Sequence, residues 1–312
     1  MKPTPEKTGI KNVSAGVSLS GLNGNAGNMR QRVRQFAILA VVLGVAFAWP
    51  LANLARFAYD SDLFSYILTV PLLSAYLVWR ERRQLPVQGE SSPALAGLAL
   101  AVGVGALGWW LAVNTRSLLL VDRLCLQTIA LLAFLLAGAF FLLGRQALRP
   151  FAFPAAFLLF MVPFPTCLTH GLEVGLQYAS AEAAALLFAV TGTTVSRQGL
   201  SFQLTGITVQ VAEECSGIHS TVVLFITSLL GGYLLLRSKV SRVVLALAVL
   251  PLAIARNGFR IYLLAALASA VNPSIIQSPL HRQGGPLFFL MSLVPFLALL
   301  WLLIKIERRK RN

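Results

Sequence analysis

Long stretches without a charged residue are the feature that most constrains this chain. Several runs of 17 or more residues contain no Asp, Glu, Lys or Arg. An α-helix needs about 20 apolar residues to cross the hydrocarbon core of a bilayer. With 57% hydrophobic and only 12% charged residues, the composition excludes an ordinary soluble domain. The sequence therefore predicts an all-α polytopic membrane protein.

The basic residues predict how the spans are oriented. The formal net charge of +15 comes from Lys and Arg gathered between the apolar runs, where they mark cytoplasmic loops. A topology of about eight spans with both termini cytoplasmic places every basic loop on that side. The expected spans are 36–55, 63–79, 93–114, 124–144, 151–162, 216–236, a seventh that begins near 243, and 286–304.

The domain organisation follows from the same pattern. Residues 1–35, rich in Gly, Ser, Asn and basic residues, are predicted to form a disordered basic cytoplasmic tail. Residues 36–304 form one membrane domain, and 305–312 form a second basic cytoplasmic tail.

Two segments do not fit a simple crossing. Residues 166–192 form an amphipathic helix, and its crossing would place the basic loop 237–242 outside. We therefore expect it to lie along the outer interface or to re-enter without crossing. Residues 261–285 are likewise expected to return without crossing. Between them, alternating runs at 200–204 and 207–211, joined by Thr205-Gly206, predict a short external β-hairpin.

The hairpin leads into Cys215, at the most polar point of the second half of the chain. Ser216 is a favourable N-cap, so Cys215 is expected at the start of the next helix. A helix N-terminus favours a thiolate. The structural alternative is a buried cysteine, which is common in apolar proteins.

Further polar residues are expected on the outer side with Cys215. Arg256 and Arg260, with Asn257 beside the first, are four residues apart and share a helix face. Arginine lowers the pKa of a nearby thiol and can stabilise an oxyanion. His281 can act as general base or acid. Together these groups predict acyl transfer through a thioester, with no metal or cofactor.

Several alternatives stay open for these residues. Either arginine alone could be an interfacial residue whose charged end reaches the aqueous surface, and His281 an ordinary loop histidine. His170 and His219 are rival bases, and His219 follows Cys215 by four residues on one helical face. Glu213 and Glu214 most simply complement the helix dipole, although one could pair with Arg260.

Three motifs in order resemble the exosortase/archaeosortase family. They are Glu214-Cys215-Ser216-Gly217, Asn257-Gly258-Phe259-Arg260, and His281 before Gly284-Gly285 and Phe288. The resemblance covers roughly residues 58–300. It implies Cys215 as nucleophile, Arg260 as essential arginine and His281 as third member, with Asn257, Arg256, Glu214 and His219 as candidate supporting residues.

The resemblance also implies a function. The family is proposed to cleave C-terminal sorting signals of exported proteins, of which the bacterial PEP-CTERM type has a short motif, a membrane helix and a basic tail. The acyl group then passes to an acceptor such as a lipid or glycan, at the outer face of the cytoplasmic membrane. In this chain Ser65-Tyr66 stands where family members often carry a histidine. An anion or substrate transporter and a non-catalytic exopolysaccharide-assembly component are the alternative functions.

Overall fold

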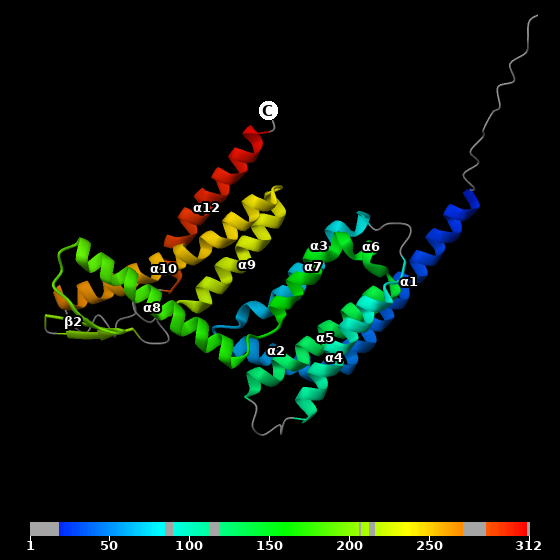
Figure 1. The fold of residues 1–312 in the computed structure, drawn as a ribbon, viewed down its shortest axis with the longest axis horizontal. Helices are drawn as coiled ribbons and strands as arrows, with labels where there is room; N and C mark the ends of the chain where they lie inside the picture. The colour runs from blue at the N-terminus through cyan, green and yellow to red at the C-terminus, as the bar shows by residue number, and fades with distance from the viewer. Residues whose placement is uncertain are drawn as a thin grey trace, which may run out of the picture. The chain divides into compact units, whose positions relative to one another are not determined.

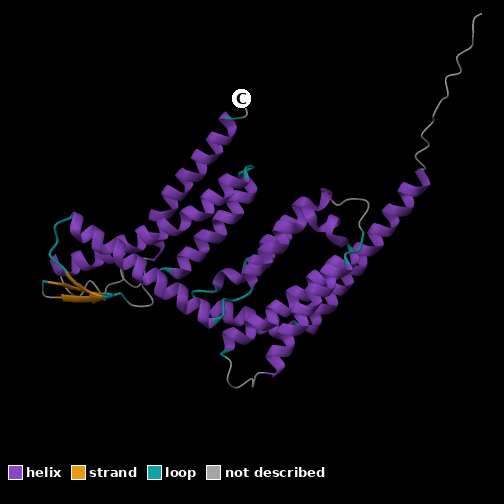
Figure 2. Cartoon of the chain, viewed as in Figure 1, coloured by secondary structure: helices purple, strands orange, loops and turns teal. Residues whose placement is uncertain are grey.

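The structure is a computed structural model that describes residues 19–84, 90–112, 119–205, 207–211, 216–270 and 285–310. Helices dominate it, and one small sheet interrupts them (Figure 1; Figure 2). The described residues divide into two compact units, the first within 1–52, 70–115 and 126–161 and the second within 53–69, 116–125 and 162–312.

The elements follow one another in a simple order. In the first half they are α1 (Leu19–Ala46), α2 (Ala48–Asp60), η1 (Ser65–Leu68), α3 (Val70–Glu81), η2 (Arg82–Gln84), α4 (Pro93–Ala112), α5 (Leu120–Leu142), α6 (Gly144–Leu148), η3 (Arg149–Phe151), α7 (Ala152–Phe157) and η4 (Leu158–Met161). In the second half they are α8 (Thr166–Val190), β1 (Ser196–Gln198), β2 (Ser201–Leu204), β3 (Ile207–Gln210), α9 (Ile218–Leu235), α10 (Lys239–Ala270) and α12 (Gly285–Arg309).

The helical membrane class is confirmed. Within the described residues, α4, α5, α9, α10 and α12 are each long and apolar enough to cross a membrane. The count rises to seven if each of two bent pairs is one span: Met29–Ala46 with Ala48–Asp60, bent by 68°, and Gly144–Met161 with Thr166–Val190, bent by 89°. The protein is therefore a multi-pass membrane protein.

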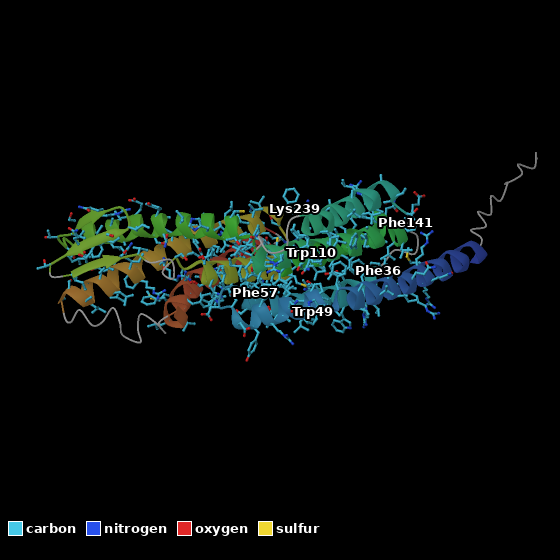
Figure 3. The ribbon with its side chains drawn as sticks, turned by 90° about the horizontal axis from the view of Figure 1, so that it is seen from below. Phe36, Trp49, Phe57, Trp110, Phe141 and Lys239 are labelled. Carbon is cyan, nitrogen blue, oxygen red and sulfur yellow. The ribbon has the colours of Figure 1, made fainter. Side chains whose placement is uncertain are left out.

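Many large apolar side chains of the helices are exposed, as expected for surfaces that face lipid. Trp49 is 74% exposed and Phe141 60% exposed, and Figure 3 labels both among the side chains drawn. Leu98 and Trp109 of α4 are similarly exposed. In water a surface this rich in apolar side chains would be an aggregation site, whereas in a bilayer it is the lipid contact.

Two expected segments differ from the structure. The stretch 63–79 does not form one span, because η1 ends at Leu68 and α3 supplies only 12 residues, Val70–Glu81. Such a helix is about 18 Å long, well short of the ~30 Å hydrocarbon core. At the other end, α1 begins at Leu19, inside the segment predicted to be a disordered tail, of which residues 1–18 lie outside the described part.

Three helices of the second unit form a bundle. Buried residues of α9, α10, α12 and the α9–α10 turn make its core: Leu224, Leu236, Leu245, Val249, Phe296, Leu300 and Leu303. Glu307 near the end of α12 accepts the backbone N–H groups of Arg237 and Ser238, at 2.9 and 3.0 Å. Since these two residues connect α9 to α10, one end of the bundle contains the α9–α10 turn and the C-terminus of α12.

The small sheet packs against α8 and α10 of the same unit. It has the order β1-β2-β3, with both pairs antiparallel. This confirms the predicted hairpin and adds β1, which the sequence analysis did not predict. Phe202 of β2, Phe188 of α8 and Ile261 of α10 lie in one buried cluster, and Figure 2 shows the strands beside the ends of α8 and α10.

Helix α8 is held by polar contacts at its start and in its last third. At its start, Asp122 accepts the backbone N–H of Thr166 at 2.8 Å and also contacts its hydroxyl, which caps a helix whose own N-cap residue is Pro165. Near its end, Glu182 pairs with Arg197 of β1 at 2.8 Å. A carboxylate at a helix N-terminus satisfies unpaired N–H groups and complements the dipole.

Candidate functional site

The first helix of the candidate site begins differently from the prediction. The N-cap of α9 is Gly217, with a left-handed φ of 71°, and not Ser216. The Ser216 hydroxyl lies 3.4 Å from the backbone N–H of Ile218, a long contact. Left-handed backbone favours glycine, so the turn into α9 is determined by Gly217. The Gly217 carbonyl accepts the hydroxyls of Ser220 and Thr221.

Arg256 and Asn257 of α10 pack directly on Gly217. Arg256 is buried, with 7% of its surface exposed, and its Nη2 donates to the Gly217 carbonyl at 3.4 Å. A Cβ added to Gly217 would lie 2.9 Å from that Nη2 and 3.3 Å from the Asn257 amide. The glycine of the cysteine motif therefore touches the arginine–asparagine motif, although 39 residues separate Gly217 from Arg256.

The same turn of α10 packs tightly on α8. Asn257 Nδ2 donates to the Ser180 hydroxyl at 3.0 Å, and both side chains are buried. Next to this bond, a Cβ on Gly258 would lie 2.5 Å from Ala183 Cβ and 3.1 Å from the α8 backbone. A side chain at position 258 would therefore force the helices apart, so glycine is required for this close approach.

Arg260 lies one turn further along α10 and faces α12. Its guanidinium carbon lies 5.7 Å from the centroid of the Phe288 ring, a cation–π distance. Arg256 thus contacts the start of α9, and Arg260 contacts the first turns of α12. The two arginines of α10 therefore contact the starts of two different helices, α9 and α12.

The distance of each arginine from the start of α10 indicates its depth in the membrane. With ~1.5 Å of rise per residue, Arg256 lies roughly 26 Å and Arg260 roughly 32 Å along α10 from Lys239. The basic residues Arg237, Lys239 and Arg242 gather at the near end. With that end at one membrane surface, Arg260 is near the opposite surface. The last ten residues of α10, 261–270, then extend beyond the hydrocarbon core beside the sheet.

Residues 261–270, the described start of the segment that was expected to return without crossing, continue α10. The helix does not stop at the arginines but continues unbroken to Ala270. Packing explains the continuation, because Ile261 and Ala265 are buried against α8 and the sheet. Residues 271–284 lie outside the described part.

Cys215, the acids Glu213 and Glu214, and His281 lie outside the described residues. Among the described acids, Asp122 accepts the backbone N–H of Thr166 at the start of α8. The described contact of Arg256 is with a carbonyl and not with a carboxylate.

The rival histidines occupy different places. His219 is exposed in the first turn of α9, with Nδ1 3.4 Å from the Leu63 carbonyl. A hydrogen bond there requires a proton on Nδ1, which donates to the carbonyl oxygen. His170 lies ten residues before Ser180 on α8, about 15 Å along the helix, so it is remote from the Asn257–Ser180 contact.

Two residues of this region were not identified from the sequence. Ser180 lies in the segment 166–192 that was expected to be amphipathic; its spacing of three from Gln177 places both on one face, and both are buried. Tyr66 of η1 is also buried, and its hydroxyl has no hydrogen-bond partner among the described residues. Burial raises the pKa of Tyr66 above its usual value, so its hydroxyl stays protonated.

Comparison with known proteins identifies the family. The family described as transmembrane exosortase (Exosortase_EpsH) matches residues 58–298, which is most of the chain. No curated protein and no solved structure matches it. The chain belongs to the transmembrane exosortase family, as the three motifs indicated, and the family implies a sorting enzyme.

Proposed function

We propose that this exosortase is a membrane-embedded cysteine transpeptidase that cleaves C-terminal sorting signals of the PEP-CTERM type from exported proteins. Cys215 is the nucleophile, Arg260 the essential arginine and His281 the proton-transfer group. The observation that carries the proposal is the contact of Arg256 with the Gly217 carbonyl at 3.4 Å. It joins the motif that contains Cys215 to the motif that contains Arg260.

Covalent geometry limits how far the reacting groups can be from this contact. Cys215 is two residues from Gly217, so their Cα atoms are at most about 7 Å apart. His281 is four residues from Gly285, which gives a limit of about 14 Å. Gly217 touches Arg256, and the α12 residue Phe288 lies under Arg260. These limits are compatible with one site formed by the three motifs.

The proposed reaction has two acyl-transfer steps. The Cys215 thiolate attacks the scissile carbonyl carbon, and Arg260 donates hydrogen bonds to the oxyanion. His281 then protonates the departing amine, the C–N bond breaks, and a thioester remains. An amine or hydroxyl acceptor, or water, gives its proton to His281 and attacks the thioester, which releases the product and regenerates the Cys215 thiolate beside the protonated His281.

The depth of the arginines favours this enzyme over a transporter. A transporter of anions is expected to hold its charges near the bilayer midplane. Arg256 and Arg260 instead lie about 26 and 32 Å from the basic start of α10, near the opposite surface. We place the basic end at the cytoplasm by the positive-inside rule, so the site faces the periplasm or exterior of the cytoplasmic membrane.

The experiment combines processing with capture of the intermediate. Cells express the full chain with an epitope-tagged exported reporter that ends in a PEP-CTERM segment. We expect Cys215→Ala to abolish cleavage and hydroxylamine to release a hydroxamate of the cleaved reporter from the unaltered enzyme. His281→Ala should also stop cleavage, whereas His219→Ala and His170→Ala should retain it. Full cleavage by Cys215→Ala would refute the proposal.

A further inference from the structure

The outer edge of β3 has no partner strand among the residues that the structure describes, and Cys215 follows this strand in the sequence. β3 is the last strand in the order β1-β2-β3, and no described strand pairs with its other side. Cys215 follows Gln210, the final residue of β3, by five residues. The sequence of β3, Ile-Thr-Val-Gln, has neither the proline nor the lysine with which proteins usually protect such an edge.

The hydrogen-bond register identifies the groups that face outward. Val211 N–H donates to the Leu200 carbonyl at 3.0 Å, and in the same register Phe202 pairs with Val209. Paired residues of antiparallel strands alternate between bonded and non-bonded pairs. Since 200/211 is a bonded pair, 202/209 is bonded as well. The backbone groups of Val209 therefore point to β2.

It follows that the backbone N–H and C=O groups of Thr208 and Gln210 point away from β2. The side chains of the strand alternate between the two faces of the sheet. Ile207 and Val209 pack on the buried cluster around Phe202. Thr208 and Gln210 are exposed. The strand is thus held against the protein by one face and by β2, while no described residue hydrogen-bonds to the outward backbone groups of Thr208 and Gln210.

We propose that this edge binds the substrate by strand addition, with the extended segment around the cleavage site pairing with Thr208 and Gln210. The inference rests on the proposed function, which requires an extended peptide at Cys215. Strand addition gives affinity through main-chain hydrogen bonds and little dependence on side chains. It therefore leaves the choice of cleavage motif to groups nearer the thiol. Because Cys215 follows Gln210 by five residues, their Cα atoms are at most about 18 Å apart, a distance that an extended peptide paired with this edge can span.

Proline provides a selective test. Thr208→Pro removes an outward N–H and adds a ring at the edge, but it leaves every β2–β3 hydrogen bond in place, as proline is tolerated at the solvent side of edge strands. Thr208→Ala loses the same side chain and keeps the N–H. We expect reporter cleavage by Thr208→Pro to fall about tenfold below that of Thr208→Ala, the effect of one lost hydrogen bond and a steric block.

Two controls use the same sheet. Val209→Pro removes an N–H that points to β2, so it should lower the melting temperature, whereas Thr208→Pro should not. On the opposite edge, Arg197 belongs to the non-bonded pair with Phe202 and its backbone points outward from β1. Arg197→Pro should cleave the reporter at the rate of Arg197→Ala, since both lose the ion pair with Glu182 and the β1 edge is not used.

A cross-link keeps the proposal testable if a proline variant misfolds. A benzophenone amino acid at Gln210, in the full chain carrying Cys215→Ala, should capture the uncleaved reporter in membranes. Capture of a second copy of the chain, or of no reporter, would overturn the proposal. If Cys215→Ala abolishes cleavage while Thr208→Pro cleaves like Thr208→Ala, strand addition is wrong and the transpeptidase stands. Cleavage by Cys215→Ala would instead refute the enzyme itself.

Discussion

Replacement of Gly258 by alanine tests whether the close approach of α10 to α8 positions the site. The new methyl carbon would lie 2.5 Å from Ala183 Cβ and 3.1 Å from backbone atoms of Ala183 and Ala184. Carbon atoms pack at about 3.5–4.0 Å, so the helices must separate by about 1 Å. The 3.0 Å bond from Asn257 to Ser180 lies beside this contact and would stretch with it.

The expected loss has two parts. Overpacking of a tight contact costs about 1–3 kcal/mol, and an interhelical hydrogen bond in a membrane protein is worth about 0.6 kcal/mol. A displacement of about 1 Å at a reacting centre can lower the rate about a hundredfold. We therefore expect Gly258→Ala to lower both the melting temperature in detergent and reporter cleavage.

The controls separate a clash from a general effect of glycine replacement. Gly175 of α8 has nothing within 4 Å of an added Cβ, so Gly175→Ala should be neutral or stabilising by up to about 1 kcal/mol. Ala183→Gly combined with Gly258→Ala removes the 2.5 Å contact and leaves the 3.1 Å contacts, which predicts partial rescue. Unchanged stability and cleavage in Gly258→Ala would refute the reasoning.

Three further predictions concern residues around the same contact. Gly217→Ala should lower cleavage and reduce the free energy of unfolding by about 1–3 kcal/mol, because the alanine has a left-handed φ and its methyl group clashes with Arg256. Gly217→Asn relieves only the backbone strain. Full stability in a thermal unfolding assay and full cleavage in Gly217→Asn would therefore exclude the clash. Arg260→Ala should abolish cleavage, and Arg256→Ala should reduce it less. If Arg260 holds an oxyanion through its planar guanidinium, Arg260→Lys should also fail to cleave while Cys215 still reacts with an impermeant maleimide. Normal cleavage by Arg260→Ala would exclude Arg260 from the site. Asp122→Ala should destabilise the protein by about 1 kcal/mol through loss of the α8 cap, and Thr166→Val, which keeps the capping N–H bond, should cost less in the same unfolding assay; equal losses would contradict the capping role.

The sequence alone determined the features that depend on local pattern. Uncharged runs predicted membrane helices because the bilayer core leaves few other structures for such a chain. Alternation on either side of Thr205-Gly206 predicted the β2–β3 hairpin, since strand side chains alternate between faces. The order of the three motifs predicted the family, which the match over residues 58–298 bears out. The catalytic roles of Cys215, Arg260 and His281 stay predictions.

Only the tertiary structure decided which residues touch. Asp122 caps α8 through Thr166, which is 44 positions away in the sequence. Arg256 donates to the Gly217 carbonyl, 39 positions away. No local pattern encodes either pairing. The sequence favoured Ser216 as N-cap by propensity, but the left-handed Gly217, packed under Arg256 and Asn257, takes that position. Propensity acts within one turn of chain, whereas the close approach at Gly258 depends on the backbone of another helix.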